Sequence, residues 1–231
     1  MKKRIGVLLL VFILSVTGNI LSASPASNIL FNVVQRPQQT SYYCGPAAAQ
    51  SVLQWSPGTG ETNLTVQNLL ASELSTVNPG GTGWYQIDGS TLSDYRMRVV
   101  LNARKPTGAP SYYPYTFGSL GSRPALTQDG VRWSILYTVG DNSRAIAADG
   151  ISTATGNAHL PGYPVSSIAH WIVVKGYTNY ANSSGDTICI ADPAKSPYVS
   201  FSPSIAAVYY ISLNKAYNFS SAFGLMQNTV P

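Results

Sequence analysis

The chain has 231 residues, of which only 10% are charged and 15 are tyrosines. Its length is enough to bury a sizeable hydrophobic core in one domain. Without the three basic residues at the N-terminus the formal net charge would fall from +5 to +2, so composition gives no electrostatic reason to expect nucleic acid or an anionic membrane as a partner.

The N-terminal segment has the layout of a secretory signal peptide. Residues 2–4 are all basic, and an apolar run over residues 7–16 is followed by small and polar residues. That run is too short for a membrane-spanning helix. We therefore expect a signal peptide over residues 1–26 and a single domain over residues 27–231, located outside the cytoplasm. An uncleaved membrane anchor is the alternative.

The segment around Cys44 predicts a helix that begins near this cysteine. A short apolar strand is expected at residues 28–34, and a polar segment then leads to Cys44, Gly45 and Pro46, followed by three alanines. Proline is favoured in the first turn of a helix, and alanine is the strongest helix former. We therefore expect Cys44 at or just before a helix N-terminus, where its small neighbours allow close packing.

Three further helices are expected before the strand-rich half of the chain. Asn63 can cap the first of them, and apolar residues then recur at helical spacing. A stretch rich in proline and tyrosine favours a loop. The expected helices are 64–74, 90–103 and 128–139, and the expected loop is 106–115.

Runs of β-branched residues in the second half of the chain predict an antiparallel sheet. The clearest strand starts at His170, and the next one stops at Pro193. Residues 204–217 are ambiguous between helix and strand. Helices followed by strands predict an α+β fold, with N-terminal helices packed on a C-terminal antiparallel sheet. The expected strands are 145–148, 170–177, 187–193 and a shorter one at 198–201.

The two cysteines, Cys44 and Cys189, allow two interpretations. The first interpretation is a single structural disulfide between them, as can form in an oxidising compartment. The other makes Cys44 a nucleophile, because a helix N-terminus lowers the pKa of a thiol. Cys189 lies between two isoleucines and is then a small buried thiol.

A nucleophilic thiol also needs a base and a group that orients the base. His159 lies among glycine and proline in an expected loop, whereas His170 starts a rigid strand and is the better candidate. If the two strands pair antiparallel, Asp192 falls near His170 and can orient its ring. Gln38 or Gln39 can offer an amide to a developing oxyanion, beside the backbone N–H of the cysteine itself.

Three short motifs resemble those of a known family. The first is Tyr-Tyr-Cys-Gly-Pro-Ala-Ala around Cys44, with Gln38 six residues before the cysteine. The second is His-Trp-Ile-Val-Val from His170, and the third is Ile-Ala-Asp-Pro around Asp192. In order and spacing these motifs are similar to the papain-fold bacteriocin-processing peptidases. They resemble more closely the secreted proteins placed in cysteine peptidase family 39 by similarity.

The resemblance implies a papain-like fold and a role for each matching residue. Cys44 would attack the substrate, His170 and Asp192 would complete the triad, and Gln38 would line the oxyanion hole. No metal or organic cofactor is implied. The chain departs from the family pattern in its long interval between Cys44 and His170, where residues 104–124 look inserted.

We therefore expect a secreted cysteine peptidase that cleaves a peptide or isopeptide bond in a peptide or protein substrate. A catalytically inactive papain-like binding module and a cell-wall amidase or transpeptidase on the same fold are the alternatives, because one set of residues serves several acyl chemistries. Tyr112, Tyr113 and Tyr115 could line a peptide or glycan groove, or be half-buried surface aromatics.

Overall fold

The structure is a computed structural model, and it describes residues 27–54, 62–87, 89–116, 125–179 and 186–228. The signal peptide expected over residues 1–26 lies outside these ranges. Among the helices within them, none is long and apolar enough to cross a membrane.

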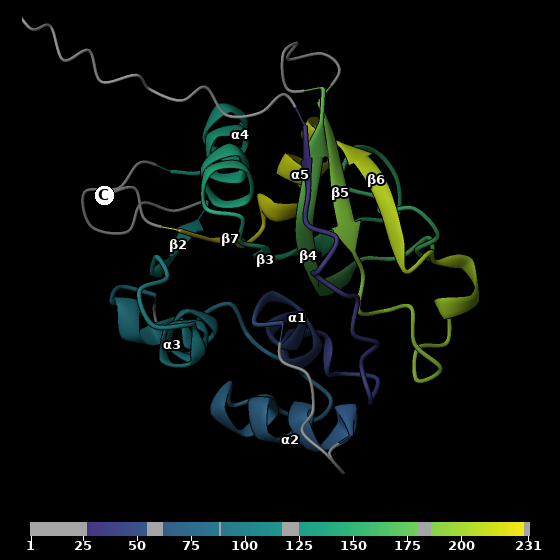
Figure 1. The fold of residues 1–231 in the computed structure, drawn as a ribbon. Coiled ribbons are helices and arrows are strands. Elements are labelled where there is room, and N and C mark those ends of the chain that lie inside the picture. The colour runs from purple at the N-terminus through teal and green to yellow at the C-terminus, as the bar shows by residue number, and fades with distance from the viewer. Residues whose placement is uncertain (1–26, 55–61, 88, 117–124, 180–185, 229–231) are drawn as a thin grey trace, which may run out of the picture.

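The helices form two groups, as Figure 1 shows. Helices α1, α2 and α3 gather at one end of the molecule, and α4 and α5 lie at the other end. A π-helical turn, Leu136–Asp141, continues directly from α4. The α-helices in the described ranges are α1 (Cys44–Val52), α2 (Asn63–Glu73), α3 (Arg96–Arg104), α4 (Gln128–Ile135) and α5 (Leu213–Ser220).

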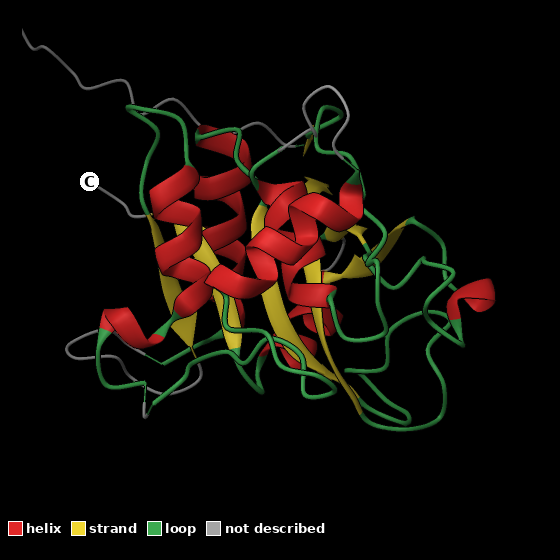
Figure 2. Ribbon diagram, turned by 90° about the horizontal axis from the view of Figure 1, so that it is seen from below, coloured by secondary structure: helices red, strands yellow, loops and turns green. Residues whose placement is uncertain are grey.

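The strands of the described residues form one sheet in the order β2-β7-β3-β4-β5-β6, and β1 pairs with β4 off this path. All the pairings are antiparallel. Figure 2 shows the helices lying over the strands. The predicted α+β class is therefore confirmed. The strands are β1 (Asn28–Ile29), β2 (Tyr112–Thr116), β3 (Ile146–Ser152), β4 (Ile168–Thr178), β5 (Thr187–Ala191), β6 (Val208–Ser212) and β7 (Gly224–Asn228).

Helix α1 is the central helix of its group and begins at Cys44, as expected. Every residue from Gly45 to Val52 is buried, because α1 packs on β3 and β4 as well as on α2 and α3. A Cβ atom added at Gly45 would lie 2.3 Å from the hydroxyl oxygen of Thr82. Glycine at this position therefore lets the loop after α2 approach the start of α1.

The strand expected at residues 198–201 is absent. These residues form turns instead, and the backbone N–H groups of Val199 and Ser202 donate within the segment rather than to a neighbouring strand. Pro197 and Pro203 flank the segment, and proline cannot donate to a sheet ladder. The pattern of aromatic and β-branched residues was therefore misleading here.

The loop expected at residues 106–115 ends in a strand. Among the strands that the structure describes, β2 lies at the edge of the sheet and pairs with β7 alone. Pro114 is accommodated because an edge strand tolerates a missing N–H on its open side. β7 was not predicted at all, since its sequence Gly-Leu-Met-Gln-Asn contains no β-branched residue.

Other boundaries also differ from expectation. The ambiguous residues 204–217 contain both β6 and most of α5. Ser212, the last residue of β6, caps the N-terminus of α5 with its side chain. Thr62, rather than Asn63, caps α2. The helix predicted over residues 90–103 is divided into a short 3-10 turn, Leu92–Asp94, and α3. The first strand is confined to two residues.

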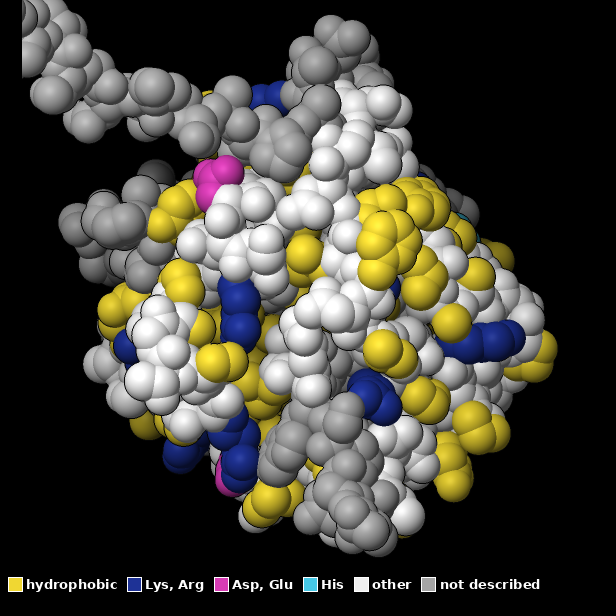
Figure 3. Space-filling model, in the orientation of Figure 1, with side chains coloured by type: hydrophobic (Ala, Val, Ile, Leu, Met, Phe, Trp, Pro, Cys, Tyr) yellow, Lys and Arg dark blue, Asp and Glu magenta, His cyan; other side chains and the backbone are white. Residues whose placement is uncertain are grey.

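Charged side chains are sparse on the face shown in Figure 3, where they lie scattered among polar and hydrophobic ones. This distribution agrees with a chain in which only 10% of residues are charged.

Candidate active site

Cys44 is the first residue of α1 and is half-buried. Tyr43 precedes it without capping the helix through a side-chain hydrogen bond. The free N–H groups of the first turn therefore point toward the end of the helix that carries the thiol, where they favour negative charge.

His170 is the third residue of β4, because the strand begins at Ile168 rather than at His170. Its Nε2 lies 2.9 Å from Oδ1 of Asp192, and the two side chains are 5% and 0% exposed. Asp192 follows β5 directly, and β4 and β5 pair antiparallel as expected. The sequence prediction that Asp192 lies near His170 therefore agrees with the structure.

The carboxylate of Asp192 is bound by three further donors. The hydroxyls of Tyr163 and Tyr209 both donate to Oδ2, at 2.9 and 2.7 Å, and the N–H of Ala194 donates to Oδ1 at 2.8 Å. Burial alone would raise the pKa of Asp192, but the charge and hydrogen bond of His170 and the hydrogen bonds from Tyr209 and Ala194 outweigh it and lower that pKa. Asp192 is thus held as a carboxylate.

Cys44 and His170 favour charge on one another. Nε2 of His170 faces Asp192, which leaves Nδ1 for the sulfur of Cys44. Burial disfavours the thiolate, but the hydrogen bond and charge of His170 and backbone hydrogen bonds from Trp171 and Gly45 lower the pKa of Cys44. Burial likewise opposes the charge on His170, but Asp192 and Cys44 raise the pKa of His170 to about 10. The arrangement favours a thiolate–imidazolium pair at neutral pH.

Gln38 is 2% exposed and lines the same pocket. Its N–H donates to the carbonyl of Pro193 at 3.0 Å, and its carbonyl accepts from the hydroxyl of Ser196. These bonds join the segment before α1 to the chain that follows Asp192. The side-chain Nε2 donates to the carbonyl of Thr40 at 2.8 Å, and an amide nitrogen carries a second N–H that can also donate.

Gln39, the alternative to Gln38, does not line the pocket. Its side chain donates to the carbonyl of Pro37 at 3.0 Å, and its backbone N–H donates to Gln67. The structure therefore places Gln38, and not Gln39, where an amide can reach a substrate.

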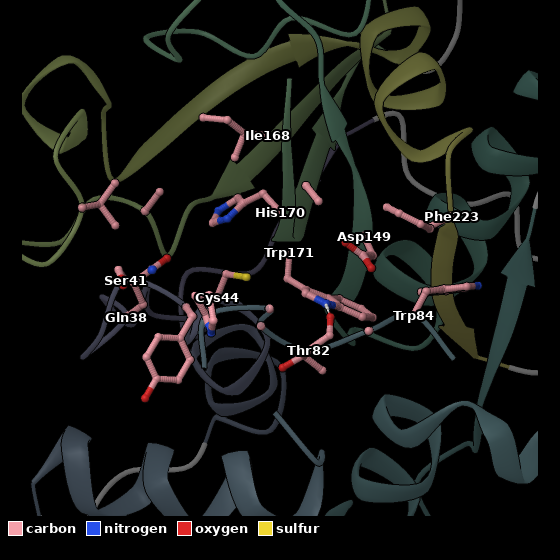
Figure 4. Close-up of a pocket in the computed structure, with 18 of the residues that line it drawn as sticks. Gln38, Ser41, Cys44, Thr82, Trp84, Asp149, Ile168, His170, Trp171 and Phe223 are labelled. Carbon is pink, nitrogen blue, oxygen red and sulfur yellow. Dashed lines mark hydrogen bonds between the residues drawn. The ribbon is translucent and has the colours of Figure 1, made fainter. Parts of the chain in front are cut away.

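The pocket has a volume of about 580 Å³, and Figure 4 shows Cys44 and His170 at its centre. Gln38 and Ser41 lie on one side of Cys44, and Asp149, Trp84 and Phe223 lie on the other. The Gly-rich loop after α2 supplies Gly80, Gly81 and Thr82 to its wall. Trp171 donates from its indole N–H to the carbonyl of Thr82 at 2.8 Å and so ties that loop to β4.

Several other residues singled out in the sequence lie away from this pocket. His159 lies in a loop, with its Nδ1 2.7 Å from the carbonyl oxygen of Thr153. Tyr112, Tyr113 and Tyr115 belong to β2 and do not line the pocket. Cys189 is buried in β5, and both cysteines are free thiols. The described residues contain no group of His, Cys, Asp and Glu side chains that could hold a metal ion.

Sequence reasoning missed Tyr163, Tyr209 and Asp149. Tyr209 lies on the buried face of β6 and could be recognised as inward-facing once that strand was assigned. Tyr163 lies in an irregular segment between β3 and β4 and carries no local signal. Asp149 is followed by Gly150, and this pair indicates a turn rather than the middle of a strand.

The model of the Peptidase_C39 like family matches residues 30–217, which contain all four candidate residues. The chain belongs to this family. The family is papain-like, so the predicted papain-like fold is confirmed, and membership supports a peptidase of the cysteine type. No curated protein matches the chain.

The match also shows which part of this Peptidase_C39 like protein lies outside the family model. β7 begins at Gly224, beyond the matched residues, yet it occupies a place within the sheet between β2 and β3. The stretch 104–124, which looked inserted, supplies β2, the partner of β7. These two strands together extend the sheet beside β3.

Proposed function

We propose that this protein is a secreted cysteine peptidase that cleaves a peptide or isopeptide bond with Cys44 as nucleophile. The observation that carries the proposal is the position of His170, which lies between a buried carboxylate and the thiol at the start of α1. A histidine held in this way is ready both to stabilise a thiolate and to deliver a proton.

In the first half of the reaction, the thiolate of Cys44 attacks the carbonyl carbon and a tetrahedral intermediate forms. Its oxyanion accepts hydrogen bonds from the side chain of Gln38 and the backbone N–H of Cys44. Protonated His170 then gives its proton to the leaving nitrogen as the C–N bond breaks, which releases the amine and leaves a thioester on Cys44.

In the second half, a water molecule enters the place of the amine. Neutral His170 takes a proton from this water while its oxygen attacks the thioester carbon. The C–S bond breaks, the carboxylic acid product leaves, and the thiolate–imidazolium pair is restored. Asp192 stabilises the imidazolium whenever His170 is protonated, because its carboxylate remains bound to Nε2.

The two alternatives make different use of the same pocket. An inactive binding module has no need of a thiol with a lowered pKa, and the conjunction of Cys44, His170, Asp192 and Gln38 in one pocket favours an enzyme. An amidase or a transpeptidase would use the same acyl-enzyme with a cell-wall substrate or an amine in place of water.

Product analysis tests this proposal. The mature protein is incubated with peptide and cell-wall fragment libraries, with and without an added amine, and the products are identified by mass spectrometry. New carboxyl termini that depend on Cys44 support hydrolysis, and amine adducts support transfer. Cys189→Ala is the matched control for Cys44→Ala. Equal product formation by Cys44→Ala and the wild type would refute the proposal.

A further inference from the structure

Asp149 is a buried carboxyl group in the pocket that the proposed chemistry does not use. It lies on β3, opposite Trp171 of β4 and Gly224 of β7, and it is 4% exposed. It lines the pocket together with Cys44 and lies on the opposite side of that residue from Gln38 (Figure 4). The pocket therefore has an acidic side, at Asp149, opposite the side where Gln38 would bind the oxyanion.

Aromatic rings surround this acidic side. The ring centroids of Trp84 and Trp171 are 5.5 Å apart, and Phe223 completes the lining next to Asp149 (Figure 4). The faces of aromatic rings attract cations, and a nearby carboxylate attracts them more strongly. The surroundings of Asp149 thus suit a positively charged group with an apolar stem.

The described residues supply no such cation with an apolar stem, and the imidazolium of His170 is already paired with Asp192 and Cys44. Among the described residues, no lysine or arginine lines the pocket or forms an ion pair with Asp149. Burial and the neighbouring Cys44 raise the pKa of Asp149 well above its usual value, against smaller opposing effects of His170 and the N–H of Gly150. An entering cation would provide the missing counter-charge and allow the carboxyl group to ionise.

The acyl part of a substrate is the part that reaches this side. In the tetrahedral intermediate, the reacting carbon is bonded to the sulfur, the oxyanion, the leaving nitrogen and the acyl chain. The oxyanion faces Gln38, and the leaving nitrogen faces His170. Trp84 and Asp149 lie on the side of Cys44 away from Gln38 (Figure 4), so we infer that this side is left for the acyl chain.

We propose that Asp149 is a specificity-determining residue that selects substrates with an ammonium or guanidinium side chain on the acyl side of the scissile bond. The inference rests on the proposed function, since it requires Cys44 to attack an acyl carbon in this pocket. A basic side chain meets a carboxylate and aromatic faces there. An acidic side chain brings a negative charge to a buried site without a counter-charge for it, and is disfavoured.

Peptidyl chloromethyl ketones test the inference, because they alkylate a reactive cysteine while their peptide occupies the acyl side. Probes carry lysine, arginine, norleucine, glutamine or glutamate in turn at successive positions before the reactive carbon. Norleucine matches the lysine stem without its charge. The second-order rate of alkylation at Cys44 is measured by mass spectrometry for the wild type, Asp149→Asn and Asp129→Asn. Asp129 is exposed on α4 and provides the matched loss of one carboxylate outside the pocket.

At one position, lysine or arginine should react about tenfold or more faster than norleucine, with glutamate slowest. This ratio should approach one in Asp149→Asn and be retained in Asp129→Asn. Because each ratio is taken within one variant, a general change in the reactivity of Cys44 cancels. A norleucine or glutamine probe that equals the basic ones in the wild type, or an unchanged ratio in Asp149→Asn, overturns the inference.

Iodoacetamide separates failure of the inference from failure of the proposed function. If Cys44 reacts with it as a thiolate but shows no basic preference, or reacts with no peptidyl probe, the inference alone fails. If Cys44 reacts as an ordinary thiol, the proposed function fails too. Should Asp149→Asn not fold, carboxyl carbon NMR of wild type decides: Asp149 should be ionised in the adduct with the favoured basic probe and protonated in the matching norleucine adduct. The same protonation state in both adducts overturns the inference.

Discussion

The carboxylate of Asp192 accepts a hydrogen bond from Nε2 of His170 at 2.9 Å, in a place where neither side chain is more than 5% exposed. A buried carboxylate without partners would be very costly. Here the hydroxyls of Tyr163 and Tyr209 and the N–H of Ala194 satisfy its remaining acceptor sites. The negative charge of Asp192 keeps His170 protonated. That charge is in turn stabilised by hydrogen bonds from β6, from the segment before β4 and from the segment after β5.

Asp192→Asn should preserve the shape of this network and remove its charge. His170 would lose the interaction that raises its pKa to about 10, and the ion pair with Cys44 would weaken. We expect a fall of about 100-fold or more in kcat/KM, together with slower alkylation of Cys44 at neutral pH. Steady-state kinetics and alkylation rates measure the two effects. Retention of both rates would contradict a supporting role for Asp192.

Tyr209→Phe should destabilise the fold by removing one hydroxyl donor from Oδ2 of Asp192. A hydrogen bond to a buried charged group contributes about 1.5–3 kcal/mol, so a loss of that order in the free energy of unfolding is expected at neutral pH. The folded-state pKa of Asp192 is lowered, so its stabilisation is present above the unfolded pKa and is lost as the pH falls through the folded pKa. The difference from wild type should therefore shrink in acid.

Tyr210→Phe is the matched control for this variant. Tyr210 is adjacent in β6 but half-exposed on the other face of the strand, so its hydroxyl does not reach Asp192. Chemical denaturation of both variants across pH measures the effect. Equal losses for the two variants would mean that the network around Asp192 does not depend on Tyr209.

Gln38→Ala should lower kcat by about 100- to 1000-fold, because it removes one donor from the developing oxyanion. Alkylation of Cys44 by iodoacetamide forms no oxyanion and should be much less affected. Gln39→Ala, the control, changes a side chain that lies outside the pocket. If the two variants lose the same activity, the oxyanion role belongs to another group.

Activity should depend on pH in a bell-shaped manner. The acid limb follows the ionisation of Cys44, whose pKa is lowered from that of an ordinary thiol. The alkaline limb follows His170, which loses its proton as the pH rises through about 10. As the two groups are coupled, the observed values belong to the pair. The dependence of kcat/KM on pH measures both limbs, and an activity that still rises at alkaline pH like that of a free thiol would argue against the ion pair.

The contribution of His170 to folding stability depends on pH in the opposite sense to that of Asp192. Its folded-state pKa is raised, so its contribution to stability is fully present below the unfolded pKa of about 6.5 and is lost as the pH rises through about 10.

The parts of the site that depend on local sequence could be predicted, and those that depend on distant contacts could not. The position of Cys44 at a helix N-terminus was predictable from the helix-forming residues next to it. The position of Asp192 near His170 was predictable from the pairing of two recognisable strands. Tyr163 and Tyr209 lie 29 and 17 residues from Asp192, and no local pattern connects them to it. Asp149 becomes a pocket residue only because β3 pairs with both β4 and β7.

The fold was predicted to a similar extent. Strands rich in β-branched residues, such as β4 and β5, were recognised, because this composition is characteristic of buried sheet. β2 and β7 were missed because β2 is stabilised by pairing with β7, and β7 by pairing with both β2 and β3, rather than by their own composition. Proline in β2 and the absence of β-branched residues in β7 obscured both.

The rate of iodoacetamide alkylation of Cys44 as a function of pH tests the central proposal most directly. Cys189 is fully buried, and burial raises its pKa against smaller opposing effects of Tyr210 and Lys175. It should therefore stay unlabelled while the protein is folded, which makes it an internal check on the fold. Mass spectrometry reads the two cysteines separately in the wild type and in His170→Ala. We predict that Cys44 reacts well below the pKa of an ordinary thiol, about 8.5, and loses that advantage in His170→Ala. A profile for Cys44 that follows an ordinary thiol, or that is the same without His170, would contradict the thiolate–imidazolium pair and the peptidase chemistry built on it.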